Sequence, residues 1–325
     1  TRVCVVEPVD NQGGERDAGS RLWITKARDP GSCHDGHMRT PSPLPSDLGR
    51  TFTVSAARER NVSPGRLRGN DLYAPFRGVR MRQRTEDAHL NQYQRAHRRE
   101  LDLIEALAHG QSAAHFVSHR SAALMWGAPM PWSRGLDLHL SVLAPRRAPR
   151  IAGVHGHRFE SSRCRVDERN GVLLSSAAST WAMLGELSLF DLVAVGDYLV
   201  RVNRAGYGRP NAGVPALTTV AEMQHVLALG RWEGMVRLRQ ALILIREDSW
   251  SPRETTTRLT LVLAGLPEPE LNRDVFDKSG RFLACLDLAF VDYKVAVEYQ
   301  GELHAGSYAE DVERIERLRA EGWIV

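Results

Sequence analysis

The stretch from Arg281 to His304 constrains the fold more than any other, because two apolar runs flank a polar turn there. The runs are rich in Val, Leu, Phe and Ala, and the turn is Asp292-Tyr293-Lys294, so the pattern predicts a β-hairpin. Each run carries a carboxylate where an apolar residue would pack better. These carboxylates are Asp287 in the first strand and Glu298 in the second.

The spacing of the polar residues in this hairpin predicts a metal site. Side chains alternate faces along a strand, so Glu298 and Gln300 point to the same side. With Asp287 on that side too, two carboxylates and an amide oxygen converge, a ligand set that suits Mg²⁺ or Mn²⁺. Gly301 permits a sharp turn that brings His304 back toward the cluster.

These residues also resemble a known family. An Asp followed about ten residues later by Glu-x-Gln is similar to the PD-(D/E)xK nuclease core, with Gln300 where Lys is commonest. The continuation through Glu298-Tyr299-Gln300-Gly301, His304, Asp311, Arg314 and residues 318–323 resembles the Vsr-like endonuclease domain (domain of unknown function 559) of actinobacterial proteins. The resemblance covers residues 251–325. It implies metal ligation by Asp287 and Glu298, and catalytic roles for Gln300, His304 and Glu254.

The chain departs from this family in two places. Family members usually have Asp where this chain has Gln300, and an amide is a weaker, neutral ligand that cannot act as a general base. Residues 322–325 are expected to begin a further core strand that the sequence does not complete. Both departures keep open the alternative of an inactive nuclease fold.

Three candidate residues of the C-terminal region have simpler explanations. Ser251, Pro252 and Glu254 form a helix start of the capping-box type, so Glu254 is either a capping residue or, as the resemblance implies, a residue aimed at the metal. Arg258, one turn later, is positioned to pair with Glu254. Asp311 and Arg314 are three residues apart on the following predicted helix, where an intrahelical ion pair explains them equally well.

Residues 50–84 predict a winged helix-turn-helix. Thr53 or Ser55 caps a first helix, a turn at residues 61–64 leads into a second helix from about Ser63 to Gly69, and an apolar hairpin follows. The second helix of this fold enters the DNA major groove. The segment resembles the N-terminal domain of AbiEi-type antitoxins, whose wing commonly has Arg-Gly-Val-Tyr where this chain has Arg77-Gly78-Val79-Arg80.

Arginines of this module are the expected DNA contacts. The alternative is that they solvate a small helical domain. From residue 50 to 100 the chain has twelve Arg against five acidic residues, whereas residues 251–325 have nine basic against fourteen acidic ones. Only three of the 43 basic residues are Lys, so abundant Arg alone is weak evidence. The expected contacts are Arg66, Arg68, Arg77, Arg80 and Arg82.

The remaining regions carry weaker patterns. Residues 1–49 are expected to be disordered or a mis-called extension of a chain that begins at Met38. Residues 85–250 predict an AbiEi-like α/β scaffold, with a strand at 136–143, helix pairs at 175–202 and 218–248, and a linker at 204–215. Its histidines lack a carboxylate partner at metal-ligand spacing, so no metal site and no hydrolase triad is predicted there.

Composition bounds these hypotheses. With 42% hydrophobic and 25% charged residues the chain has the composition of a soluble globular protein, without an apolar run of membrane-spanning length or a signal-peptide pattern. We therefore expect a cytoplasmic α+β multidomain protein without membrane partners. Four cysteines without a CxxC pair indicate neither a disulfide framework nor a zinc site.

Three functional hypotheses follow. The first is a metal-dependent DNA endonuclease of restriction-endonuclease-like α/β/α fold, brought to DNA by the winged helix. The second is an antitoxin-like DNA-binding repressor with an inactive nuclease fold. The third is an interaction module without nucleic acid, against which the clustered carboxylates argue. DNA is the expected partner, and the antitoxin resemblance adds a toxin partner or self-association.

Overall fold

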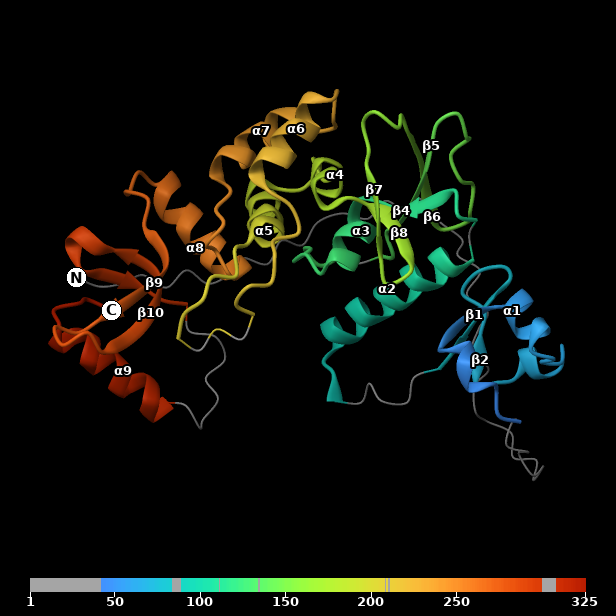
Figure 1. Cartoon of the computed structure of the whole chain (residues 1–325), viewed down its shortest axis with the longest axis horizontal. Helices are drawn as coiled ribbons and strands as arrows, with labels where there is room; N and C mark the ends of the chain where they lie inside the picture. Colours follow the sequence, from blue (N-terminus) through green and yellow to red (C-terminus); the bar gives the residue numbers. More distant parts are fainter. Residues whose placement is uncertain are drawn as a thin grey trace, which may run out of the picture. The chain divides into compact units, whose positions relative to one another are not determined.

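Nine α-helices and three β-sheets make up the described part of the chain (Figure 1). The structure is a computed structural model that describes residues 42–83, 89–110, 112–133, 135–207, 209, 211–299 and 308–325, and only the backbone of 308–311. The α+β class expected from the sequence is confirmed. None of the described helices combines the length and the apolar character that crossing a lipid bilayer requires.

The N-terminal module combines one α-helix with a three-stranded antiparallel sheet of order β1-β3-β2. Thr53 caps the helix as predicted, because its Oγ1 accepts the Ala56 N–H at 3.0 Å. Leu48, in a short 3₁₀ turn, is buried in the core of the module, so the module begins before residue 50, where we expected its boundary. The elements are η1 (Ser46–Leu48), β1 (Thr51–Thr53), α1 (Val54–Glu59), β2 (Leu72–Tyr73) and β3 (Val79–Arg82).

The second helix expected over Ser63–Gly69 is not formed at that length. Its place is taken by the 3₁₀ turn η2 (Arg66–Arg68). Gly65 and Gly69 flank the turn, and so short a segment gains too few hydrogen bonds to offset the cost of helix nucleation. The module therefore presents a tight basic turn where a helix-turn-helix has a recognition helix.

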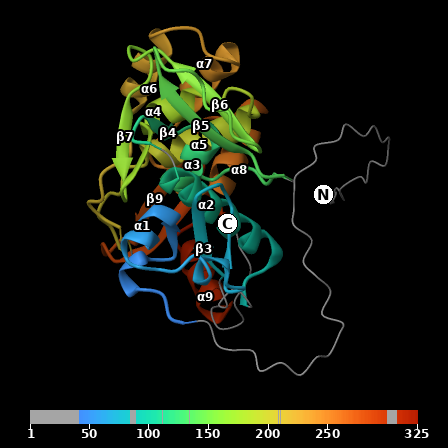
Figure 2. The ribbon, with the colours of Figure 1, turned by 90° about the vertical axis from the view of Figure 1, so that its right-hand side faces the viewer.

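The middle of the chain is built on a five-stranded mixed sheet of order β6-β5-β4-β8-β7. Figure 2 shows four of its strands, β6, β5, β4 and β7. The β5–β6 and β4–β8 pairs are parallel, and the other two pairs are antiparallel. Helices α2, α3 and α4 contribute side chains to its core. The elements are α2 (Gln92–His109), β4 (His115–Val117), α3 (His119–Trp126), β5 (Leu138–Leu143), β6 (Val154–Phe159), β7 (Val166–Arg169), β8 (Val172–Ser175) and α4 (Ala177–Ala182).

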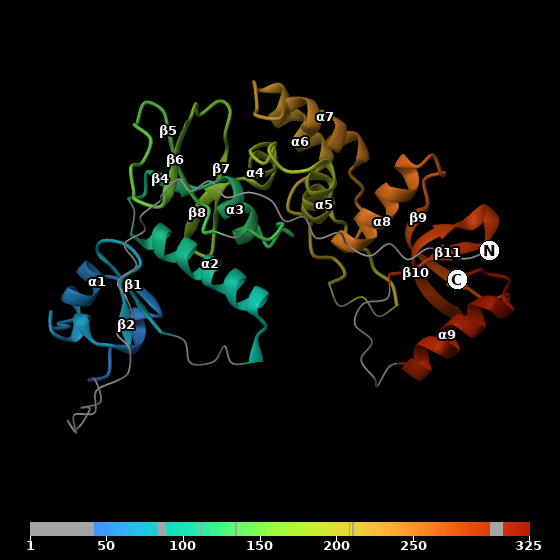
Figure 3. The same cartoon turned by 180° about the vertical axis from the view of Figure 1, so that it is seen from behind.

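Both helix pairs predicted in the middle region are present. The first is α4 with α5 (Leu189–Val200), and the second is α6 (Val220–Ala228) with α7 (Met235–Leu244). Helix α5 packs against α7 and against α8 (Pro252–Leu263), as Figures 1 and 3 show. Strand β5 confirms the alternating strand predicted over 136–143.

The C-terminal module follows the order α8–β9–β10–β11–α9. The predicted hairpin is confirmed: β10 pairs with β11 antiparallel, around a 3₁₀ turn at Val291–Tyr293. Leu286 and Leu318 are completely buried in its core. Ile324 bridges Val295 of β11 in parallel, at the place where a further strand was expected. The strands and last helix are β9 (Glu270–Phe276), β10 (Phe282–Phe290), β11 (Val295–Val297) and α9 (Tyr308–Ala320).

Candidate active site

Glu254 lies at the start of α8 and does more than cap the helix. Ser251 is the N-cap, and its Oγ accepts the Glu254 N–H at 3.2 Å. The Glu254 carboxylate is 7% exposed, and its Oε2 accepts the Trp250 N–H at 2.9 Å and the Asn272 Nδ2–H at 2.7 Å. Burial raises the pKa of Glu254, and the negative charge of Asp287 raises it further. The helix start thus places a second carboxylate within electrostatic reach of Asp287.

Asp287 is the centre of the site, in the middle strand of the C-terminal sheet. The β9–β10 register places it opposite Asn272, and the β10–β11 register continued by one residue places it opposite Glu298. Its Oδ2 accepts the Tyr299 N–H at 3.0 Å. Burial raises the pKa of Asp287 above its usual range, while the positive charge of Arg314 acts in the opposite direction. A half-buried carboxylate of this kind favours a nearby cation.

Glu298 is held by an arginine from α9. Arg314 Nη1 lies 2.9 Å from Glu298 Oε1 and 2.7 Å from Oε2, and the two side chains are 24% and 10% exposed. This contact joins α9 to the residue that follows β11. The side chain of Asp311 lies outside the described residues.

Three of the predicted site residues are thus brought onto neighbouring elements: Glu254 on α8, Asp287 on β10, and Glu298 after β11. Gln300 and His304 lie outside the described residues. The oxygens of the three carboxylates do not all lie within 4.8 Å of one another. A metal ion at this site would therefore be held by only one or two of these carboxylates, a number of protein ligands that Mg²⁺ accepts when it retains several waters.

The expected pair between Arg258 and Glu254 is not formed. Arg258 is completely buried, donates to Glu268 Oε1 at 2.8 Å and lies 3.5 Å from Asp197 of α5. Asp197 also accepts the Thr255 hydroxyl at 2.7 Å. This buried network fixes α8 against α5 and so sets the position of Glu254.

Basic side chains beside the site come from the segment that the sequence predicts only as a linker. Arg204 donates to the Leu271 carbonyl at 3.2 Å, and Arg209 pairs with Asp274 of β9 and stacks on Trp250, 4.7 Å from the ring centroid. A cavity of about 230 Å³ is lined by these three side chains and their neighbours: Arg201, Asn203, Arg204, Arg209, Asn211, Ala212 and Trp250.

Part of this cavity lining has unused hydrogen-bond donors. Among the described residues, the buried Trp250 Nε1–H and the Nε–H groups of Arg204 and Arg209 have no acceptor. Arginines and an aromatic ring with spare donors suit an anionic, planar ligand such as a nucleotide. The one sequence signal for this cavity is the presence of Arg204 and Arg209 within an otherwise Gly/Pro-rich stretch.

Three of the five candidate DNA-contacting arginines are used inside the N-terminal module. Arg66 holds Asp71 with two hydrogen bonds of 2.6 and 2.8 Å. Arg80 donates to the Leu67 carbonyl at 2.9 Å, and Arg82 donates to the Pro45 carbonyl at 3.0 Å. Arg68 and Arg77 are exposed and are the better placed for a phosphate contact.

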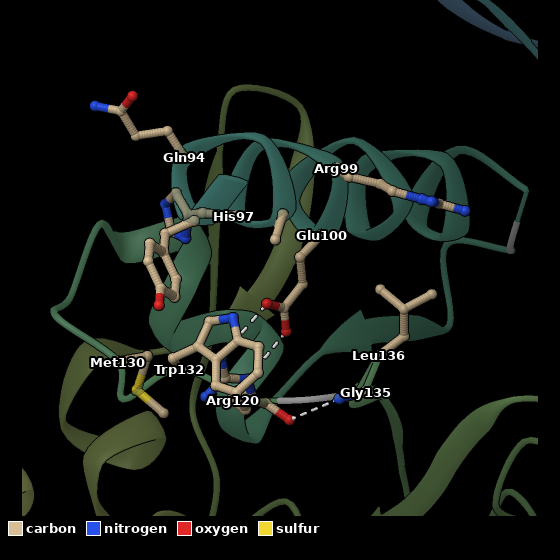
Figure 4. A pocket seen from close by; sticks show the side chains of 12 residues that line it. Gln94, His97, Arg99, Glu100, Arg120, Met130, Trp132, Gly135 and Leu136 are labelled. Atoms are coloured by element: carbon tan, nitrogen blue, oxygen red, sulfur yellow. Dashed lines mark hydrogen bonds and ion pairs between the residues drawn. The ribbon is translucent and has the colours of Figure 1, made fainter. Parts of the chain in front are cut away.

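A second cavity, of about 660 Å³, lies between α2 and the loop after α3 (Figure 4). Glu100 and Arg120 form a buried ion pair there, with Arg120 Nε 3.0 Å from Glu100 Oε1. Tyr93 and Trp132, which also line the cavity, meet edge to face, and each is more than half exposed. Among the described residues that line the cavity there is no cluster of metal ligands, and no pattern in the sequence predicted the cavity.

No protein-family model matches this chain, and no curated protein matches it either. Function is therefore inferred from the residues of the site themselves.

Proposed function

We propose that this protein is a metal-dependent DNA endonuclease that hydrolyses phosphodiester bonds. The observation that carries the proposal is that three carboxylates, Glu254, Asp287 and Glu298, lie on neighbouring elements of the C-terminal module, with Glu254 within electrostatic reach of Asp287. Two of them are half-buried or buried with raised pKa values, a state typical of functional carboxylates. The cavity with its arginines and Trp250 adjoins Glu254 through the Trp250 N–H contact.

The order of elements supports a restriction-endonuclease-like α/β/α fold for residues 251–325. A helix precedes three antiparallel strands, a second helix follows, and Ile324 then pairs in parallel with β11. Leu318 of α9 packs against the sheet core. Asp287 lies on the central strand and Glu298 follows the neighbouring strand, and these positions support the resemblance to PD-(D/E)xK nucleases.

The proposed chemistry divides between the ion and the protein. Mg²⁺ or Mn²⁺, when bound by Asp287 and Glu298, would supply the Lewis acidity that polarises a phosphodiester and lowers the pKa of a bound water. The protein orients the carboxylates: Asn272 and the Trp250 N–H fix Glu254, and the Tyr299 N–H fixes Asp287. The resemblance assigns proton transfer to His304.

DNA binding is proposed for two basic surfaces. One is the cavity beside α8, with Arg204, Arg209 and Trp250. The other is the N-terminal module, which we propose as a winged-helix variant that uses the wing and the basic turn η2 through Arg77 and Arg68. Its small sheet and capped first helix support this assignment, and the absence of a full second helix among the described residues makes base reading by that element a smaller contribution.

A DNA-binding repressor with an inactive nuclease fold is the second candidate, and one observation favours it. Arg314 contacts both carboxylate oxygens of Glu298, as a bound metal ion would. In this case the protein acts through DNA binding alone, with a toxin partner or a second copy of the chain as further partner.

Plasmid cleavage and DNA binding, measured on the same preparation, separate the two candidates. The endonuclease nicks or linearises supercoiled plasmid with Mg²⁺ or Mn²⁺, and Glu298→Ala abolishes this while DNA still shifts on a gel. A wild-type protein that shifts DNA but leaves it intact with either metal ion is the repressor. A protein that does neither excludes both candidates.

A further inference from the structure

Three histidines from distant parts of the sequence cluster in the middle region. His119 begins α3, His139 lies on β5, and His157 lies on β6. One ligand nitrogen from each lies within 4.8 Å of the others, and this is the one such group found among the described residues. The rings of His119 and His157 stack with centroids 3.9 Å apart.

The parallel pairing of β5 with β6 creates the cluster. Its register sets His139 beside His155, and Ser141 beside His157. Residues two apart on a strand share a face, so all four side chains lie on one face of the sheet. His119 joins them because β4, which leads into α3, is the antiparallel neighbour of β5.

One ring nitrogen of His139 contacts a carboxylate, and the other faces the histidine cluster. Its Nε2 lies 2.9 Å from Asp137 Oδ1, and its Nδ1 lies 3.0 Å from His157 Nε2. Two imidazoles bound to one tetrahedral Zn²⁺ at about 2.0–2.1 Å place their nitrogens roughly 3.3 Å apart, close to this spacing. A carboxylate behind a ligand histidine is the usual means of fixing its tautomer and raising its basicity.

The ring of His119 is also oriented by a neighbouring polar side chain. Its Nδ1 lies 2.9 Å from Ser118 Oγ, which also accepts the Ser141 hydroxyl at 2.6 Å. This contact leaves Nε2 as the ligand atom. The backbone of His119 is in the left-handed region, with φ of 50°, a conformation uncommon outside glycine and often found at functional sites.

We propose that His119, His139 and His157 bind a divalent transition-metal ion, with Asp137 and Ser118 orienting two of the ligands. Three neutral imidazoles suit Zn²⁺ best among the abundant ions, and leave a fourth position for water or a further ligand. This proposal differs from the expectation from the sequence that the histidines of this region form no metal site. The site is independent of the acidic site in the C-terminal module.

Zinc binding to the full-length, tag-free protein tests this proposal. Zn²⁺ is titrated against a chromophoric chelator, with excess Mg²⁺ to saturate the acidic site. We expect one tightly bound Zn²⁺ per chain. His157→Gln and His139→Gln are each expected to weaken binding by more than the roughly 10- to 100-fold loss expected for Asp137→Asn.

His115→Gln is the matched control, because His115 is a half-buried histidine on β4 that contacts Ser112 at 2.9 Å and lies outside the cluster. It should leave the affinity unchanged. Co²⁺ in place of Zn²⁺ adds a visible spectrum that reports the ligand set in the wild type, independently of whether a variant folds. Failure of the wild type to bind Zn²⁺ or Co²⁺, or unchanged affinity in both folded ligand variants, overturns the proposal.

Discussion

Arg314 of α9 contacts both carboxylate oxygens of Glu298, at 2.9 and 2.7 Å. The strand register sets Glu298 opposite Asp287, so Arg314 supplies positive charge where two carboxylates face each other. Like charges directly opposite on a sheet are destabilising unless they are neutralised. Arg314 therefore partly fills the electrostatic role that a bound metal ion has in the proposed enzyme.

Removing this charge should make the protein depend on metal for stability. Arg314→Gln is expected to lower the free energy of unfolding by about 1–3 kcal/mol without divalent metal, because the mostly buried Glu298 loses a charged partner. Mg²⁺ should restore much of the loss. Arg319→Gln is the control, since Arg319 pairs with Glu316 on the exposed face of the same helix. Urea unfolding with and without Mg²⁺ measures both effects, and a loss that Mg²⁺ does not reduce would argue against a metal at Glu298.

The buried Asp197 predicts a dependence of stability on pH. Burial raises its pKa to about 6, against the opposing effects of the Arg246 N–H and the charge of Arg258. Because the folded protein binds this proton more tightly than the unfolded chain, the contribution of Asp197 is full below about pH 4 and is lost as the pH rises through 6. Two pKa units correspond to about 3 kcal/mol.

Asp197→Asn removes this titration while keeping the shape of the side chain. The difference in unfolding free energy between wild type and variant should therefore change between pH 4 and pH 7, in the direction of a relatively less stable wild type at the higher pH. Parallel stability profiles over this range would show that Asp197 has an ordinary pKa in the folded state.

Asn272 combines a left-handed backbone with a buried bond to the site. Its φ is 47°, it is 2% exposed, and its Nδ2 donates to Glu254 Oε2 and to the Asp248 carbonyl. Both Asn272→Gly and Asn272→Ala remove these two buried hydrogen bonds, at a cost of about 1–3 kcal/mol. Alanine adds strain of roughly 1 kcal/mol that glycine avoids. We therefore expect the alanine variant to be the less stable in urea unfolding, the reverse of the usual order within a strand.

How far the sequence predicted the fold depended on whether the determining interactions were local. The start of α8 was predictable because Ser251, Pro252 and Glu254 act within one helical turn. The β10–β11 hairpin was predictable because its alternation and turn are contiguous. The helix expected over Ser63–Gly69 was wrong, because the intervening glycines outweighed the helix-turn-helix pattern.

The site residues, too, were predictable only where the interactions between them are local in the sequence. Asp287 and Glu298 could be paired because one hairpin carries both. The bond between Asn272 and Glu254, and the cluster of His119, His139 and His157, depend on how distant segments pair, and a single sequence contains no direct signal for that. Arg204 and Arg209 were missed because a Gly/Pro-rich stretch indicates only a loop.

The exposed arginines of the N-terminal module predict a specific salt dependence of DNA binding. Replacing Arg68 and Arg77 together by alanine should weaken binding and reduce the slope of log affinity against log salt by about 2, with little change in stability. The double variant of Arg146 and Arg147, exposed residues in the loop after β5, removes the same charge and is the control. Equal effects of the two double variants would mean that net charge, rather than this surface, binds DNA.

Cleavage of supercoiled plasmid by Asp287→Asn, compared with Asp292→Asn, tests the proposed nuclease most directly. Both substitutions remove one carboxylate from the same hairpin, but Asp292 lies exposed in its turn. We predict that wild type and Asp292→Asn cut the plasmid with Mg²⁺ or Mn²⁺ and not with EDTA. Asp287→Asn should be slower by at least about 100-fold, because loss of a metal ligand removes several kcal/mol of transition-state stabilisation. Cleavage that persists in Asp287→Asn, or a wild type that cuts nothing with either metal, would contradict the account.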